Sequence, residues 1–311
     1  MCKVETMENF DSLFLFKLPI RIVKSLGLWQ DENSSWLYRF YGLLFHLVCI
    51  DLYVFMQIIY LIFMFEDVKD FSHVLGGVVI YIVIVLKTSN FMYKLKEIKM
   101  LIVMMEKLID FTANGCKQRP LLQKQVLRDH KVFKIFLANC VISAWLAIIV
   151  ILVYHQEHRL PYKTWAPVDY HNNKYWYWVL AFYQIFCPTC GACIVATLDM
   201  LPVFFICIAT GLINELCQRI SSIGANEIQL IMEPPTELQI KFLLLSEQTR
   251  IEEQHLKELL NCIEIHKKIK QFTTKSGEIF STMIFAQGVS SAINMCTAAF
   301  QLSLVKKIMQ C

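Results

Sequence analysis

An apolar run of 40 residues, from Tyr175 to Asn214, is the feature that most constrains how this chain folds. The run contains a single formal charge, Asp199. About 20 apolar residues cross the hydrocarbon core of a bilayer, so this run crosses once and continues beyond it. It opens with four aromatic residues, Tyr175 to Trp178, and such rings settle at the membrane–water interface. A soluble protein would have to bury this segment on all sides, so the run predicts one long membrane helix.

The composition supports a membrane protein with several spans. The chain has 311 residues, of which 56% are hydrophobic and only 18% are charged, whereas soluble domains carry about 25% charged residues. We therefore expect an all-α, polytopic membrane helix bundle, with a domain from 38 to 311 that follows a cytoplasmic N-terminal segment, 1–37. Its five transmembrane helices are expected near residues 40–65, 71–93, 133–154, 175–213 and 277–305.

The basic residues predict the orientation of these helices. Of the 30 Lys and Arg residues, 24 lie in the alternate segments 1–39, 87–134 and 215–275. Because positive residues are retained in the cytoplasm, the N-terminus and both long loops are expected there. The sequon Asn33-Ser34-Ser35 would then be unused. If the fourth run were instead two helices, divided at Pro188 or Pro202, every later segment would lie on the opposite side of the membrane. A turn exposed to lipid at either proline would leave backbone groups unpaired, so we expect one helix.

Several motifs have both a structural and a chemical interpretation. Asp51 lies inside the first apolar run, where an ionisable group either bonds to a neighbouring helix or has a function. The pair Gly76-Gly77 favours close approach of helices. The motif from Cys187 to Cys193 resembles a metal-binding run, but such sites need four converging ligands, and small residues at this spacing favour helix packing.

No motif in the sequence indicates an enzyme or a bound cofactor. His155, Glu157 and His158 could bind a metal ion in the outer loop, but no fourth ligand accompanies them, so we expect an ordinary exposed loop. There is no phosphate-binding glycine loop, nucleophile elbow or zincin motif. The basic loops are explained by membrane topology, so no nucleic-acid partner is expected.

A candidate ligand pocket lies in the outer halves of the second, third and fourth helices, roughly 73–84, 143–154 and 175–187. These segments are apolar and aromatic with few polar atoms, as in pockets for small apolar molecules. Ordinary helix packing is the alternative for any one residue. The candidate ligand-binding residues are Tyr81, Ser143, Trp145, Trp178, Phe182 and Phe186.

The chain resembles the insect odorant receptor family. The shared features are the cytoplasmic N-terminus, the long basic loop between helices two and three, the long fourth helix and the amphipathic approach to helix five. The resemblance is closest from Leu256 to Leu304, and Asp199 after the aromatic start of helix four is also typical of the family. The matching positions in the closest segment are Leu260-Asn261-Cys262-Ile263, His266, Phe280, Gln287, Cys296 and Phe300.

This resemblance implies a function. Members of the family bind small volatile odorants within the outer halves of the helices. The helices themselves contact membrane lipid. An odorant-tuned subunit assembles with a common co-receptor into a hetero-oligomer, expected to be a tetramer, that forms a non-selective cation channel. The expected location is the plasma membrane of sensory neuron dendrites. The family has seven helices, and the pore-lining seventh has no counterpart here, so we expect the chain to be C-terminally incomplete and non-conducting as it stands.

Three other functions remain open at this point. A gustatory receptor-type channel subunit would carry its signature in the seventh helix. A G-protein-coupled receptor would have an external N-terminus, opposite to the charge distribution, and no Asp-Arg-Tyr-like triplet follows helix three. A transporter would be favoured by an inverted internal repeat, and we detect none.

Overall fold

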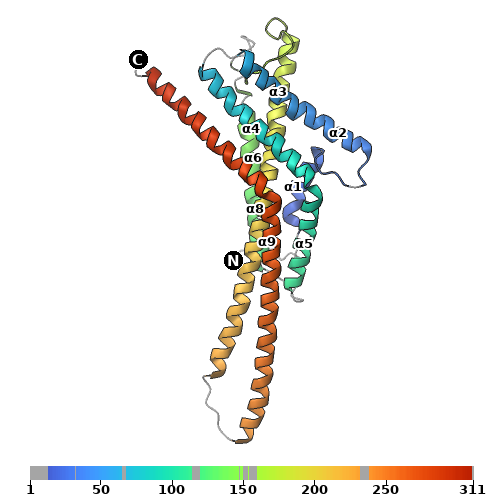
Figure 1. Ribbon diagram of the computed structural model, residues 1–311, viewed down its shortest axis with the longest axis vertical. Coiled ribbons are helices and arrows are strands. Elements are labelled where there is room, and N and C mark those ends of the chain that lie inside the picture. Colours follow the sequence, from blue (N-terminus) through green and yellow to red (C-terminus); the bar gives the residue numbers. More distant parts are fainter. Residues whose placement is uncertain are drawn as a thin grey trace, which may run out of the picture. The chain divides into compact units, whose positions relative to one another are not determined.

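The computed structural model consists of helices and connecting segments (Figure 1). Within the described residues every regular element is helical and none is a strand, which confirms the expected all-α bundle. The structure describes residues 13–31, 33–64, 68–113, 120–146, 148–149, 153, 160–231 and 238–309.

The helices follow the order of the apolar runs. Four stretches of described residues are long and apolar enough to cross a membrane: Trp36–Phe63, Val74–Tyr93, Lys174–Ile223 and Glu252–Ser303. The expected third span, 133–154, is described only in part, because several of its last eight positions lie outside the described residues. The elements are α1 (Phe14–Ser25), α2 (Trp36–His46), η1 (Leu47–Asp51), α3 (Leu52–Ile59), η2 (Tyr60–Met64), α4 (Val68–Tyr93), α5 (Leu95–Ala113), α6 (Pro120–Trp145), α8 (Lys174–Ile231) and α9 (Leu238–Met309).

The apolar run that dominates the sequence is a single helix. Helix α8 has 58 residues and keeps both Pro188 and Pro202 in its interior. At 1.5 Å per residue it is about 87 Å long, far more than the roughly 30 Å of a bilayer core. Helix α9, with 72 residues, likewise joins the amphipathic approach and the fifth apolar run in one helix.

The chain divides into two compact units, and the boundaries fall inside α1, α5, α6, α8 and α9. Unit 1 comprises Met1–Leu15, Lys99–Asp129 and Val203–Glu278. Unit 2 comprises Phe16–Ile98, His130–Pro202 and Ile279–Cys311.

Unit 1 is built on α8 and α9, which run side by side through it (Figure 1). The rings of Phe205 and Phe272 meet edge to face, with centroids 5.9 Å apart. Two side chains tie the flanking helices to α8 through backbone oxygens. Gln125 of α6 donates from Nε2 to the oxygen of Cys207 at 2.6 Å, and Arg219 of α8 donates to the oxygen of Thr112 on α5.

Unit 2 contains the first span, which is one continuous helical run built from α2, η1, α3 and η2. The segments η1 and η2 are π-helical. Such segments are rare and are often associated with functional sites. The short helix α1 packs against this unit through buried side chains, and the Trp29 ring that follows it lies 6.3 Å from the ring of Phe91 on α4.

The end of α1 approaches α2 through two glycines. Gly27 has φ +74°, a conformation that side-chain-bearing residues rarely adopt. A Cβ atom on Gly27 would lie 2.4 Å from the Cα of Gly42. The hydroxyls of Tyr38 and Tyr41 then donate to the oxygens of Lys24 and Ser25, at 2.7 and 2.8 Å. These bonds satisfy carbonyls that the end of a helix leaves unpaired.

Candidate functional site

The candidate pocket residues fall into two groups in unit 2. Tyr81 of α4 is buried, at 7% exposure. The side chains of the other five are exposed. On α6, the Ser143 hydroxyl donates to the oxygen of Asn139 at 2.9 Å. The exposed residues are Ser143, Trp145, Trp178, Phe182 and Phe186.

Three of the exposed residues form one aromatic face on α8. Trp178, Phe182 and Phe186 are spaced by four residues, so their side chains lie on the same side of the helix. The rings of Phe182 and Phe186 stack with centroids 6.0 Å apart and planes inclined by 12°. The structure therefore brings these three together, but it does not bring Tyr81 into contact with them through any ring contact.

Tyr81 belongs instead to a buried aromatic cluster between the first span, α4 and α8. Its ring lies 4.7 Å from that of Tyr53, which lies 6.0 Å from that of Tyr183. A Cβ atom on Gly191 would be 3.6 Å from the Tyr81 ring and 3.3 Å from Ile84. The expectation that the Cys187–Cys193 motif serves helix packing is confirmed at this glycine, which lets α8 approach α4 closely.

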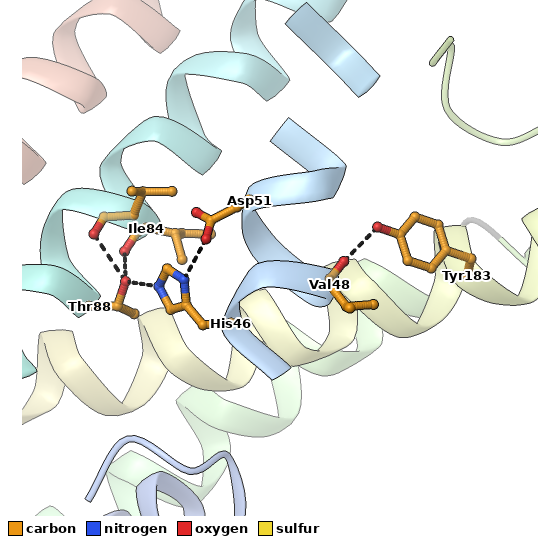
Figure 2. Close-up of polar contacts among 7 residues, drawn as sticks. His46, Val48, Asp51, Ile84, Thr88 and Tyr183 are labelled. Atoms are coloured by element: carbon orange, nitrogen blue, oxygen red, sulfur yellow. Dashed lines mark hydrogen bonds and ion pairs between the residues drawn. The ribbon is translucent and has the colours of Figure 1, made fainter. Parts of the chain in front are cut away.

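A polar network surrounds η1 and joins the first span to α4 (Figure 2). His46 Nδ1 lies 3.0 Å from Asp51 Oδ2, and Nε2 lies 2.7 Å from the Thr88 hydroxyl. The single hydroxyl hydrogen of Thr88 is donated to the oxygen of Ile84 at 2.8 Å. The Asp51 carboxylate and the Thr88 hydroxyl thus hold the two ring nitrogens of His46. Polar groups at membrane depth are thereby bonded to one another rather than left facing lipid.

The π-helical turn explains why this pair forms. In a π-helix the backbone bonds residue i to residue i+5, so side chains five positions apart come together. His46 and Asp51 have this separation, and η1 lies between them. Asp51 thus bonds within its own helical run, and His46 carries the connection to the neighbouring helix. On the same segment the carbonyl of Val48 accepts from the Tyr183 hydroxyl at 2.7 Å (Figure 2).

A second charged group lies inside the apolar part of α4. Lys87 is the first residue of the basic segment 87–134, yet it lies within the candidate span Val74–Tyr93 and is only 2% exposed. Its ammonium group donates to the Asp199 carboxylate on α8 and to the Gln287 amide oxygen on α9. The side chain of Asp199 is 26% exposed. The isolated charge of the apolar run is therefore half of an ion pair between α4 and α8, and the Gln287 amide connects this pair to α9.

A buried glutamine fixes the segment that leads into α8. Gln184 is completely buried. Its Oε1 accepts from the backbone N–H of Tyr162 at 3.0 Å, and its Nε2 donates to the oxygen of Tyr162 at 3.0 Å and to the Thr164 hydroxyl at 2.8 Å. One residue further along the chain, the N–H of Trp165 donates to the oxygen of Met56 at 3.1 Å. The segment is thereby held against α8 and α3.

Two of these features had weak signals in the sequence. Lys87 stands at the edge of an apolar run, where it looks like the first residue of a basic loop, and its partner is more than one hundred positions away. Gln184 is an uncharged polar residue within an aromatic stretch. The His155, Glu157 and His158 group lies outside the described residues.

Comparison with known proteins gives consistent matches over most of the chain. The family described as 7tm Odorant receptor matches residues 67–311. Odorant receptor Or1 of Anopheles gambiae is 26% identical over 315 residues, which cover 94% of this chain and 71% of that receptor. The structure of the insect olfactory receptor OR5 from Machilis hrabei aligns with a TM-score of 0.64 at 15% identity, over 92% of this chain and 70% of that one. The same receptor in complex with eugenol aligns with the same TM-score over 93% and 71%.

Proposed function

Because the chain belongs to the odorant receptor family, we propose that it is an odorant receptor subunit that binds a small, largely apolar volatile molecule in the outer parts of its second, third and fourth membrane helices. The family match selects this function over the gustatory and G-protein-coupled alternatives. The proposed ligand-binding residues remain Tyr81, Ser143, Trp145, Trp178, Phe182 and Phe186.

The observation that carries this proposal is the aromatic face of α8. Trp178, Phe182 and Phe186 are 47%, 69% and 42% exposed, although they lie in a candidate membrane span. A stacked aromatic pair that the chain itself leaves uncovered offers an apolar wall to a ligand. The hydroxyl of Ser143 on α6 is a candidate for the one or two polar groups that such pockets contain. The eugenol complex of the Machilis relative supports a small organic ligand.

The proposal extends to assembly and gating. We propose that the subunit joins a common co-receptor in a hetero-tetramer and that odorant binding opens a non-selective cation channel. The plasma membrane of sensory neuron dendrites is the proposed location, with the N-terminus and the long loops in the cytoplasm. The distribution of Lys and Arg supports this orientation, and moving Lys87 into the membrane leaves the excess of basic residues in the proposed cytoplasmic segments intact.

Odorant dose–response curves test the proposal in cells that express the native transcript of the receptor with its co-receptor. Burial of a large apolar side chain is worth about 1.5–3 kcal/mol, so Phe182→Ala is expected to weaken potency by roughly ten-fold or more. Ser143→Ala and Tyr81→Phe are expected to change the ranking of ligands that carry polar groups. The matched control is Phe285→Ala on α9, which removes an equally exposed ring outside the proposed pocket. If all three substitutions leave potency and ranking unchanged, the pocket lies elsewhere.

A further inference from the structure

A small cavity opens in unit 2 between the first span, α4 and α9, and none of the six odorant-pocket residues lines it. Its volume is 280 Å³. Sites for small molecules begin at about 300 Å³, and an engineered cavity of about 150 Å³ already holds benzene. The cavity therefore has room for a small ring or a short chain with one polar group. Gln57, Gly76, Gly77, Asn294 and Thr297 are among the residues that line it.

The cavity contains a buried acceptor without a donor. Gln57 of α3 is 4% exposed, and its Oε1 has no hydrogen-bond partner among the described residues. A buried carbonyl oxygen that is left unpaired is costly, so a donor supplied by a ligand would be favoured there.

The wall on α9 presents further oxygen atoms. The amide of Asn294 donates from Nδ2 to the Ser290 hydroxyl at 3.3 Å, and the Thr297 hydroxyl donates to the backbone oxygen of Asn294 at 2.9 Å. A Cβ atom on Gly76 would lie 3.4 Å from Asn294 Oδ1 and 3.7 Å from Thr297 Oγ1. The glycine thus leaves space beside oxygens that accept hydrogen bonds.

The polar character of the cavity also limits the charge of its ligand. The lining, which includes Tyr162, has no carboxylate among its described residues, so a cationic donor such as an ammonium group would leave water without a charged partner, which is costly. The position of Tyr162 is fixed by its two backbone hydrogen bonds with Gln184. A neutral O–H group satisfies the acceptors without this cost.

A neighbouring cavity offers space for an apolar tail. It has a volume of 410 Å³ and shares Ile80 and Asn294 with the first. Val83, Val195 and Met295 contribute apolar surface to it. We infer that the pair of cavities is a second ligand site, which takes a small neutral alcohol whose hydroxyl donates to Gln57 and whose carbon chain extends past Ile80.

Photoaffinity labelling tests this inference on the full chain in lipid nanodiscs. The probe is octanol with a diazirine in its chain, and labelled peptides are located by mass spectrometry. We expect labels near Gln57 or between Asn294 and Gln301. We also expect 2-phenylethanol to compete for this labelling about three- to ten-fold better than its methyl ether, because the ether has no hydrogen to donate.

Two variants make the test specific. Gln57→Leu removes the acceptor at similar size and is expected to abolish the preference for the alcohol over the ether. Gly76→Ala keeps Gln57 but adds a methyl group to the wall of the cavity, and is expected to reduce labelling. The matched control, Gln271→Leu, makes the same chemical change on α9, at a residue that lines neither cavity. Tryptophan fluorescence confirms that each variant is folded. Labelling confined to other helices would show that the cavities do not hold the probe, and equal competition by alcohol and ether would show that Gln57 accepts no hydrogen bond from the ligand. Because the readout is labelling at Gln57 and α9, it stands apart from any effect of Phe182→Ala on odorant potency.

Discussion

Breaking the ion pair between Lys87 and Asp199 should destabilise unit 2 more than any surface substitution. The ammonium group of Lys87 is almost fully buried, and its partners come from α8 and α9. Removal of one member of a buried pair costs about 3–5 kcal/mol, because the other charge is left without compensation. The pair itself can be close to neutral for stability, since two charges must first leave water.

The two single substitutions should not be equal. Asp199→Asn leaves the Lys87 cation at 1% side-chain exposure with a neutral amide beside it, so its cost is expected at the upper end of that range. Lys87→Met leaves the Asp199 carboxylate, which is 26% exposed and retains some access to polar surroundings, so its cost is expected at the lower end. The double variant removes both charges and is expected to be more stable than either single variant.

The assay is the apparent melting temperature of the purified chain in detergent, followed by tryptophan fluorescence at a fixed heating rate. At about 2–4 °C per kcal/mol, each single substitution is expected to lower this temperature by roughly 6–20 °C. The matched control is Glu264→Gln, which breaks the exposed Lys268–Glu264 pair at 3.0 Å. That pair is worth about 0.5 kcal/mol or less. The reasoning would be refuted if the single variants melted at the same temperature as the Glu264→Gln control, or if the double variant melted below both single variants.

Further substitutions test other contacts, by the same melting assay or by proteolysis. Gly27→Ala should lower the melting temperature sharply, because of its positive φ and a 2.4 Å contact, whereas Gly288→Ala, with open space around it, should raise it slightly. Gln184→Leu removes three hydrogen bonds to the segment before α8, and should increase proteolytic cleavage there; an unchanged cleavage pattern would contradict this role. Thr88→Val removes the hydroxyl that bonds His46 Nε2 and should cost about 1–3 kcal/mol; a loss no larger than that of Glu264→Gln would mean that the network contributes little.

The membrane fold follows from features that are local in the sequence. The run from Tyr175 to Asn214 is apolar over a length that only a membrane helix explains, and α8 is that helix. Gly191 likewise carries a local signal, since small residues among cysteines predict close helix packing, and it lies against α4.

The contacts that join distant segments could not be predicted in the same way. Lys87 marks the end of an apolar run in any hydropathy profile, and only the three-dimensional fold brings Asp199 and Gln287 to it. Similarly, the π-helical turn that pairs His46 with Asp51 has no periodic signature over five residues. Hydropathy identifies Phe182 as a membrane residue, but it does not indicate which surface of the helix the chain itself covers.

Protection of a thiol on the aromatic face tests the central claim most directly. Cysteine is introduced by Phe182→Cys and, in a separate control, by Phe285→Cys on α9; each receptor is expressed with its co-receptor and treated with a membrane-permeant alkylating reagent. Mass spectrometry then measures alkylation at the new cysteine with and without an activating odorant. We expect the odorant to slow alkylation at position 182 in a concentration-dependent manner and to leave position 285 unchanged. Equal alkylation at position 182 with and without odorant, at concentrations that activate the receptor, would contradict a ligand site on this face of α8.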